Sequence, residues 1–477
     1  MFGPSELAFC LLAISGVVSA SNNSASQFDP CSYAAADVLV RDVIVIGGGA
    51  SGTYGAIALK DAGRSVAVVE KQGNFGGHVN TYNDAATGLA LEYGVQGYSN
   101  DSITRAFFER FNVPFIPLFA GVAQLVEDFN IGKNVTPVTG NSILTWSNFT
   151  NAYYPDPALG VHLPSPVPED LLLPFRDFIK KYHIEDAAFL IWSISGPTDN
   201  LLDQLTLYVV LGANAASAPI PGGAPYIPEV ATRNNSEVYG KAQVELGKSA
   251  LLNSQVVASQ RSNKSVKLVV QSGSSKKLLI ASQVLYSAPI ILDNLNTFDL
   301  DSREHDIFKE VYYTAWYTTL VTDTGLAPGY SYENAANNTL YNIPIEPYTF
   351  HIGPSRINTT FYAFYGATHA TSEADVRAAI TQNIRTLSGN TSSPKILAFA
   401  SHTPFKQLVS ADAIRAGFYD KLNALQGYRG MFYTGNALDV SGSSSLYNFT
   451  QHLVPGIQKA VAANKVPADA GKCKRGW

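Results

Sequence analysis

Charged side chains are scarce in this chain. Only 15% of its 477 residues are charged, and 38 acidic residues against 33 basic ones give a net charge of −5. Without an excess of positive charge there is no basic field to hold a phosphate backbone, which excludes nucleic acid as a partner. The 46% hydrophobic content excludes general disorder, and the length allows two or three domains.

Long apolar runs are also few. Leu7–Val18 is an apolar run too short to span a bilayer, and the small residues Val18-Ser19-Ala20 end it. Although no Lys or Arg precedes it, this pattern predicts a secretory signal at residues 1–20 rather than a buried N-terminal helix. No later run predicts a membrane span. We therefore expect the protein in the secretory pathway or outside the cell.

Cysteine is rare, with three residues in the whole chain. Cys10 falls in the signal, which leaves Cys31 and Cys473. An oxidising compartment favours a disulfide between them over two free thiols. No cluster of residues predicts a metal site.

Sequons for N-glycosylation fit the same compartment, because sugars need exposed positions in exported proteins. We expect glycans on nine asparagines: Asn22, Asn100, Asn134, Asn148, Asn234, Asn263, Asn337, Asn358 and Asn390. A tenth sequon, at Asn448, lies in the closing helix predicted below, so we expect it to be buried and unmodified.

A strand–turn–helix–strand unit follows the Ser/Asn/Ala-rich stretch 21–37, which reads as a linker. Val38–Ile46 ends in a continuous β-branched run, typical of a buried parallel strand. Ala50–Ala62 reads as a helix and Ser65–Glu70 as a second strand. The unit predicts the α/β class and a Rossmann-type domain.

The glycines of the turn form G-x-G-x-x-G with Gly47, Gly49 and Gly52. These positions give a tight turn, close approach to a pyrophosphate and close packing of helix on strand. The helix N-terminus then faces the phosphates, and Glu70 ends the next strand where it would accept bonds from ribose hydroxyls. We expect a dinucleotide to contact Gly47, Gly49, Ala50, Ser51, Gly52, Glu70 and Lys71.

A second glycine loop, Gly76-Gly77, follows in "KQGNFGGHVNTY". A plain NAD dehydrogenase does not need it, so the doublet favours FAD. With it, the chain resembles the amine-oxidase-type flavoproteins, in which arginine usually follows the doublet. Here the residue is His78. The "GGH-x-NTY" form, the signal and the sequons resemble the fungal secreted flavoproteins of the β-cyclopiazonate dehydrogenase family.

This resemblance implies FAD, bound non-covalently or through a histidine, and His78 is the residue placed for either contact. "LEYGVQGY" is similar to the family's segment beside the flavin ring, and "YTGNALDVSGSSSLYNF" to its closing strand, turn and helix. The further cofactor contacts implied are Gly76, Gly77, Gly94, Val95, Gln96, Val257, Gly435, Asn436 and Phe449. Asn436 stands where the family often has glutamate. Ordinary core packing is an equal explanation for Val257.

The division into domains follows from the order of elements. We expect a Rossmann-type FAD-binding domain completed by discontinuous segments, 38–100, 236–290 and 395–470. An α+β substrate domain would comprise 101–235 and 291–394. Tyr- and Phe-rich strands at 312–322 and 358–366 suit the walls of a site for a flat, apolar molecule, although sheet packing explains many of these rings.

Three residues are candidates near the chemistry: His402 as acid or base, Tyr317 on an aromatic strand, and Phe449 at the family's aromatic position beside the flavin. The lysine that many family oxidases carry on the strand at 312–323 is absent, which leaves oxidase and dehydrogenase action open.

The resemblance implies a secreted oxidoreductase of fungal secondary metabolism. It would remove hydride from a carbon next to nitrogen, or from an allylic carbon, of a small apolar natural product, with ring closure in some cases. Oxygen or another acceptor would take the electrons. Alternatives are a prenylcysteine-oxidase-like thioether oxidase and a secreted flavin-binding protein without turnover.

Overall fold

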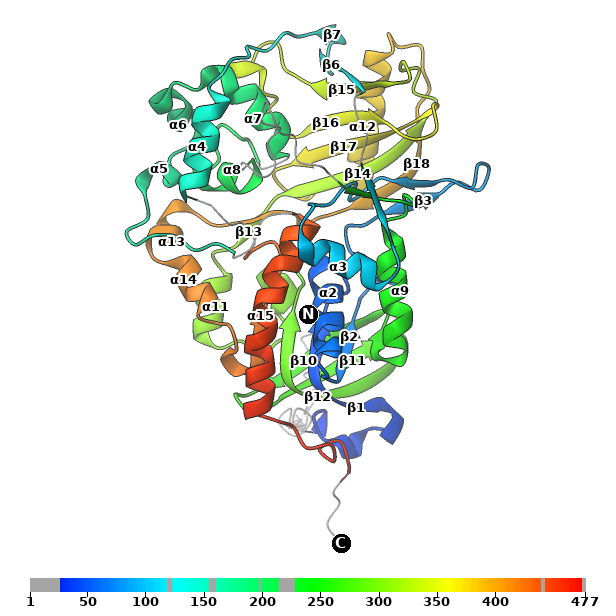
Figure 1. Cartoon of the computed structure of the whole chain (residues 1–477), viewed down its shortest axis with the longest axis vertical. Helices are drawn as coiled ribbons and strands as arrows, with labels where there is room; N and C mark the ends of the chain where they lie inside the picture. The colour runs from blue at the N-terminus through cyan, green and yellow to red at the C-terminus, as the bar shows by residue number, and fades with distance from the viewer. Residues whose placement is uncertain are drawn as a thin grey trace, which may run out of the picture.

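Two large β-sheets organise the chain, one in the lower half of Figure 1 and one in the upper half. A computed structural model describes residues 26–117, 122–153, 160–196, 199–213, 228–438 and 442–473. The predicted signal at 1–20 and Asn22 lie outside the described residues. Within those ranges, no helix has the length and apolar character needed to cross a membrane.

The first sheet is built around β1 (Val38–Ile46), which has parallel neighbours β2 (Val66–Val69) and β12 (Ser275–Tyr286). Val43–Ile46 and all of β2 are buried, as expected for strands covered on both faces. The other strands of this sheet are β9 (Ala250–Leu251), β10 (Ser254–Arg261), β11 (Val266–Ser272) and β20 (Met431–Tyr433). The predicted strand–helix–strand unit is therefore the centre of this sheet.

Helices α2 (Ala50–Asp61) and α15 (Ser443–Ala463) lie side by side over this sheet (Figure 1). Their approach is close at Gly55, where a Cβ atom would come within 2.5 Å of Leu285 and 3.0 Å of Thr450. Helix α9 (Ser236–Leu246) packs in the same hydrophobic cluster through Val238 and Ala242. The three helices thus bury the sheet from which the glycine turn emerges.

Helix α3 (Ser102–Arg110) corrects one predicted boundary. The ring of Phe107 lies 5.2 Å from that of Tyr54 in α2 and 5.1 Å from that of Tyr447 in α15. The helix therefore packs on the first domain, although the sequence division assigned residues from 101 onward to the second. Its own spacing of apolar residues predicts a helix but not the surface that the helix covers.

The second sheet has the strand order β18-β14-β17-β16-β15-β6-β7. Its strands are β6 (Ala123–Asp128), β7 (Lys133–Asn134), β14 (Ala315–Thr322), β15 (Tyr330–Asn334), β16 (Tyr348–Pro354), β17 (Thr360–Ala367) and β18 (Lys395–Ser401). Strand β18 pairs with β14, so residues 395–401 belong to this sheet and not to the first domain, where the sequence division placed them.

One helix, α12 (Glu373–Leu387), covers a face of the second sheet, and a cluster of helices lies beside the sheet (Figure 1). α12 packs on this face through Val376, Ile380 and Ile384. The helical cluster beside the sheet consists of α4 (Ile143–Tyr153), α5 (Glu169–Leu172), α6 (Phe175–Tyr182), α7 (Ala188–Ser195) and α8 (Thr206–Gly212). Pro174 separates α5 from α6, because proline disfavours a helical conformation at the residue before it, and Leu173 is extended.

Shorter elements connect the two sheets. The remaining helices are α10 (Leu292–Leu295), α11 (Ser302–Phe308), α13 (Ala411–Arg415) and α14 (Phe418–Asn423). The remaining strands form three pairs: β3 (Thr81–Asn83) with β4 (Ala90–Glu92), β5 (Phe115–Pro117) with β8 (Pro228–Val230), and β13 (Tyr312–Tyr313) with β19 (Gln407–Leu408).

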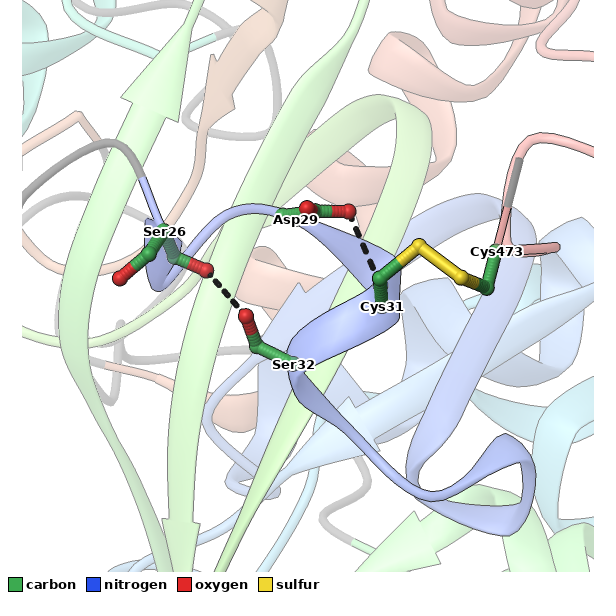
Figure 2. The surroundings of a disulfide bond; sticks show 5 residues. All are labelled: Ser26, Asp29, Cys31, Ser32 and Cys473. Carbon is green, nitrogen blue, oxygen red and sulfur yellow. Dashed lines mark hydrogen bonds between the residues drawn. A yellow bond between two sulfur atoms is a disulfide. The ribbon is translucent and has the colours of Figure 1, made fainter. Parts of the chain in front are cut away.

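The two ends of the described chain are joined by a disulfide between Cys31 and Cys473, 442 positions apart (Figure 2). This is the pair that the sequence predicts. The Asp29 side chain accepts a bond from the Cys31 amide at 2.9 Å, and Phe28 is buried against the first sheet. Residues 26–37 also contain two short 3₁₀ helices, so this part of the predicted linker is anchored to the first domain.

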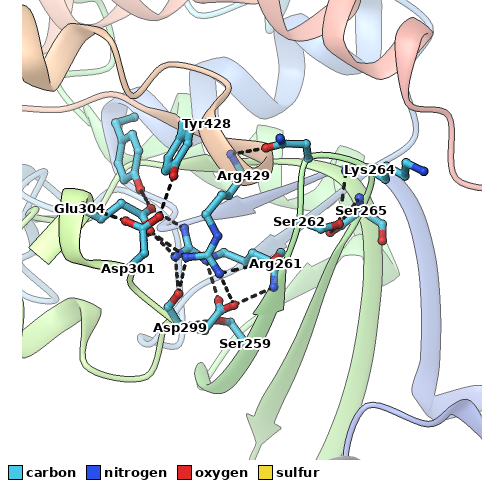
Figure 3. A network of polar contacts seen from close by, with 12 residues as sticks. Ser259, Arg261, Ser262, Lys264, Ser265, Asp299, Asp301, Glu304, Tyr428 and Arg429 are labelled. Atoms are coloured by element: carbon cyan, nitrogen blue, oxygen red, sulfur yellow. Dashed lines mark hydrogen bonds and ion pairs between the residues drawn. The ribbon is translucent and has the colours of Figure 1, made fainter.

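A buried ion network fixes the outer strand β10 to the chain around α11 (Figure 3). Arg261 pairs with Glu304 at 2.7 Å and with Asp299 at 2.8 Å, and Arg429 pairs with Asp299 at 2.7 Å. The side chains of Arg261 and Glu304 have no exposed surface. Because a buried charge is costly without its partners, the network defines one arrangement of these segments.

Candidate cofactor and substrate site

Two positions of the turn between β1 and α2, Gly47 and Gly52, have no room for a side chain. Gly47 has φ +98°, and a Cβ atom there would lie 2.7 Å from Ser287 Oγ. A Cβ at Gly52 would lie 2.0 Å from the carbonyl oxygen of Gly47. Gly49 begins α2 without a side chain that caps it, so the first amides of the helix, at Ala50 and Ser51, point outward. This is the local geometry of a pyrophosphate site.

The glycine doublet lies directly against this turn. A Cβ atom on Gly77 would come within 2.9 Å of Gly49 Cα, and the Gly76 amide donates to the Gly48 carbonyl at 2.9 Å. Gly77 has φ +57°, which glycine adopts most easily. The two loops therefore form one cradle lined by backbone. Side chains at these glycine positions would fill it.

Glu70 is buried beside the turn and helps to hold it. Its Oε2 accepts from the Gly48 amide at 2.6 Å and its Oε1 from the Gln72 amide at 2.7 Å. Each carboxylate oxygen has a second lone pair, so the side chain can still accept from a ribose hydroxyl. Lys71 is exposed at the edge of the cradle. These residues fit an extended dinucleotide.

The segment Gly94, Val95 and Gln96 lies between the cradle and the second sheet. A Cβ atom on Gly94 would come within 2.2 Å of the His78 carbonyl oxygen. The Val95 carbonyl accepts from Asn235 Nδ2 at 2.6 Å, and Gln96 hydrogen-bonds to the Tyr362 hydroxyl of β17. The segment that resembles the family's flavin-facing loop is thereby tied to the second sheet.

The closing segment supplies Gly435, with φ +110°, and Asn436, whose Nδ2 donates to the Phe405 carbonyl at 3.3 Å. Val257 lies at a register shift between β10 and β11. Phe449 is 4% exposed and packs where a Cβ atom on Gly160 would touch its ring at 2.6 Å. The cofactor roles of these residues stay predictions from the resemblance.

His78 and His402, from opposite ends of the sequence, stack on each other with ring centroids 4.2 Å apart. His402 Nε2 is 2.6 Å from Asn80 Oδ1. Burial, with a smaller contribution from the positive charge of Lys71, lowers the pKa of His78 to about 4. Burial lowers the pKa of His402 well below its usual value, and the neighbouring His78 is the second, smaller cause. Both rings are therefore neutral at physiological pH.

One face of the second sheet is lined with aromatic rings and looks toward this pair. We name the rings of Trp316, Tyr362, Phe364 and His351 the aromatic face. Trp316 lies 5.5 Å from Phe364 and 5.9 Å from Phe405, which itself lies 5.9 Å from His78. Ring contacts thus run without a break from the second sheet to the glycine doublet.

Tyr317 is on the other face, which corrects its prediction as a residue near the chemistry. Side chains alternate along a strand, so Tyr317 points away from Trp316 and packs in the cluster under α12. Its hydroxyl donates to the Thr371 carbonyl at 2.9 Å and accepts from the Thr371 amide at 2.7 Å. The hydroxyl therefore uses its one hydrogen and one lone pair in bonds to Thr371.

Two buried polar groups near this face, those of Lys406 and Glu346, belong to no sequence motif that would have predicted a functional role. Lys406 donates to the Ser195 carbonyl at 3.1 Å, and burial lowers its pKa to about 7. Both carboxyl oxygens of Glu346 are buried without a described hydrogen-bond partner, and burial raises its pKa. Lys406 and Asn436 line the same cavity, together with Tyr208 and Gly212. Lys406 follows Phe405, so a lysine does lie at the junction of the domains, although not on β14.

A His–Glu pair on the aromatic face was also missed. His351 Nδ1 hydrogen-bonds to Glu333 Oε1 across β16 and β15. The only sequence signal was a histidine in an otherwise apolar strand pattern, "YTFHI".

Comparisons with known proteins agree with this geometry. A family model described as an NAD(P)-binding Rossmann-like domain matches residues 45–111. The FAD-dependent oxidoreductase dbaF of Emericella nidulans is 41% identical over 96% of this chain and 98% of its own length. Beta-cyclopiazonate dehydrogenase of Aspergillus oryzae is 34% identical over 88% of this chain and 93% of its own.

Solved structures share the fold at low identity. A fatty acid isomerase from P. acnes that produces CLA superposes with a TM-score of 0.69 at 15% identity, covering 87% of this chain and 98% of its own. A variant of putrescine oxidase gives 0.67 at 15% identity, covering 88% and 99%.

A glycine cradle for FAD beneath a second, aromatic-faced sheet defines a flavoenzyme with the two-domain fold of the amine oxidases. More narrowly, the chain belongs to the family of FAD-dependent oxidoreductases that includes beta-cyclopiazonate dehydrogenase. It is thus an FAD-dependent oxidoreductase acting on a small molecule, and the alternative of a flavin-binding protein without turnover does not fit this family.

Proposed function

We propose that this enzyme oxidises a small, flat, apolar natural product of fungal secondary metabolism. The bond broken is a C–H next to nitrogen or at an allylic carbon, and in some products oxidation leads to ring closure. Support comes from the two relatives named above, both of which come from fungi. One of them is named for the dehydrogenation of beta-cyclopiazonate.

The observation that carries the proposal is the aromatic face. Trp316 and Phe364 stack at an interplanar angle of 28°, and the loop with Gln96 contacts the same sheet at Tyr362. A planar substrate that lies on these rings would face the predicted flavin loop, and apolar surfaces of this kind favour apolar ligands. Bound FAD supplies the two-electron acceptor, while the chain orients the substrate and excludes water.

The test is anaerobic mixing of the purified yellow protein with candidate substrates, followed by the flavin absorbance. A panel should contain an indole alkaloid, an allylic terpenoid and a prenyl thioether. Bleaching by either of the first two supports the proposal. Bleaching by the thioether alone would favour the prenylcysteine-oxidase-like alternative.

Two variants of neighbouring residues test the aromatic face. Trp316→Leu should weaken substrate binding about tenfold or more, because a large buried ring is lost, while flavin content is unchanged. Tyr317→Phe, one position along β14 but on the opposite face, is the matched control and should bind substrate normally. Equal effects of both changes would contradict the proposed substrate wall.

We further propose that the enzyme is secreted as a glycoprotein. The apolar run at 7–18, the disulfide and the sequons support this. Seven of the asparagines predicted to carry glycans are exposed: Asn100, Asn134, Asn148, Asn263, Asn337, Asn358 and Asn390. Asn234 is half-buried. Expression in a fungal host should place the protein in the medium with Ser21 as its first residue, and retention inside the cells would contradict secretion.

Attachment of FAD through His78 remains a proposal. The lowered pKa of this ring favours it, because only a neutral imidazole is nucleophilic. Protein precipitated with acid should then stay yellow, and a peptide with the flavin mass should contain His78. Complete release of the flavin into the supernatant would show non-covalent binding.

A further inference from the structure

A row of paired residues crosses the second sheet on the aromatic face. Thr318 of β14 pairs with Phe364 of β17, Phe364 pairs with His351 of β16, and His351 pairs with Glu333 of β15. Directly opposed residues of neighbouring strands project from the same face of a sheet. His351 therefore lies on the face that carries the ring contacts to Phe405 and His78.

Glu333 holds the ring of His351 in one orientation. Its Oε1 is bonded to His351 Nδ1, and Glu333 is 7% exposed. A carboxylate can only accept, so Nδ1 carries a proton, and whenever the ring is neutral the free lone pair is on Nε2. The arrangement matches the carboxylate–imidazole pairs in which an acid sets the tautomer of a catalytic histidine.

The side chain of His351 is not fully enclosed by its neighbours. The side chain keeps 19% of its surface exposed, and its ring stacks near those of Phe364 and Tyr362 with centroids 6.1 and 6.3 Å away. Gly353, two residues along β16, lets the rings of His351 and Tyr362 lie close over the strand, because a Cβ atom there would lie 2.7 Å from His351 Nε2 and 2.4 Å from Tyr362 Cε2. Thr318 Oγ1, in the same row, is buried without a described partner.

We propose that His351 is the proton acceptor of the oxidation and that Glu333 is its positioning residue. This rests on the proposed function. One substrate C–H bond would break, and its hydrogen would leave with both bonding electrons for the bound FAD, which would supply the two-electron acceptor. The second hydrogen, on a neighbouring oxygen, nitrogen or carbon, leaves as a proton and forms the N–H bond at His351 Nε2. Its electron pair stays on the substrate as the new π bond or as the nucleophile of ring closure.

A substrate of matching chemistry therefore carries an acidic hydrogen next to the oxidised carbon. An enol, an indole N–H or an amide N–H meets this requirement. A substrate with only unactivated C–H bonds does not, since a neutral imidazole cannot remove its proton.

The experiment compares FAD-loaded wild type with His351→Gln and Glu333→Gln, and with His369→Gln as the control. His369 is an exposed histidine of the same domain. We expect His351→Gln to slow substrate-driven bleaching by about 10²-fold or more, and Glu333→Gln by about tenfold, with flavin content and unfolding temperature unchanged. In a His351→Gly variant, added imidazole should restore part of the rate, which a purely structural histidine would not show.

Nitrogen NMR of the histidine rings gives a second readout that needs no substrate. In the wild type His351 should be protonated at Nδ1 only, and in Glu333→Gln its ring should become a mixture of tautomers. A bleaching rate within about threefold of wild type in His351→Gln would overturn the proposal. If no compound of the panel bleaches the wild type, the proposed function fails instead. The tautomer seen by NMR then tests the role of His351 separately, and a ring protonated at Nε2 would overturn that role.

Discussion

The imidazole rings of His78 and His402 stack almost in parallel, with their planes 9° apart. One ring follows the glycine doublet near the start of the chain, and the other follows β18 near its end. The contact joins the nucleotide cradle to the second sheet, and its stability depends on both rings being neutral. Protonation would place positive charge in a buried pair.

The stacked pair should make the fold sensitive to acid. The pKa of His402 is lowered in the folded state, so its contribution to stability is present above about pH 6.5 and is lost as the pH falls below that value. We expect His402→Phe to lose less stability than wild type on going from pH 7.5 to pH 5, by roughly 1 kcal/mol for each pH unit below about 6.5. Denaturant unfolding at both pH values measures this. His369→Gln is the control, and an identical loss in His402→Phe and wild type would refute the assignment.

The turn at Gly52 should not tolerate a methyl group. Gly52→Ala would place Cβ 2.0 Å from the Gly47 carbonyl oxygen, so the cradle must open. We expect the purified variant to retain less than about a tenth of the flavin, since the phosphate site is lost. Gly240→Ala in α9 is the matched control, because nothing lies within 4 Å of its Cβ. It should keep its flavin and gain about 0.5–1 kcal/mol from helix propensity. Full flavin retention in Gly52→Ala would exclude this turn as the phosphate site.

Glu92 should make the fold less stable as the pH rises from about 5 to about 8. Its Oε1 accepts from Thr81 Oγ1 at 2.7 Å and from the Asn235 amide at 2.6 Å, but burial raises its pKa to about 8. A raised pKa stabilises the fold at low pH, and this contribution is lost progressively as the pH rises from the ordinary pKa of 4.5 to the folded value of about 8. Glu92→Gln should therefore gain stability relative to wild type by roughly 1 kcal/mol per pH unit between about pH 5 and 8. The exposed Glu373→Gln is the control. A pH-independent difference would show that Glu92 ionises normally.

The disulfide should contribute to stability without affecting the flavin site. Joining Cys31 to Cys473 restricts nearly the whole unfolded chain, so changing both to serine should cost about 2–5 kcal/mol. The flavin spectrum should stay unchanged, because neither residue lies near the cradle. Unfolding of wild type with and without reductant is the companion measurement, and no effect of reductant would contradict the prediction.

Asn448 should remain without a glycan although it begins a sequon. The residue is half-buried, not fully buried as the sequence predicted, but its Nδ2 donates to Asp101 Oδ1 at 3.0 Å and to the Ser444 carbonyl at 2.8 Å. The nitrogen that would carry sugar is therefore engaged in α15. Asn390, an exposed residue just beyond α12, is the comparison site and should be occupied. Glycopeptide mapping decides, and sugar on Asn448 would mean that α15 is not formed when the glycan is added.

Much of the first domain follows from local sequence. The β-branched run of β1, the glycines at 47, 49 and 52, and Glu70 at the end of β2 are close in sequence, and their backbone requirements are local. The disulfide could be inferred as well, because two cysteines allow only one pair. These features identify the cofactor class without tertiary information.

The substrate side was decided only by tertiary structure. The strand "AWYTTLVT" is buried on both faces, so its sequence cannot say whether Trp316 or Tyr317 faces the site. The same holds for the pairing of His351 with Glu333, which depends on the register of β15 and β16, and for the placement of 395–401 in the second sheet. A glycine turn is specified by the backbone of a few neighbouring residues, whereas the choice of strand partner and of the face that meets the cofactor depends on packing between distant segments.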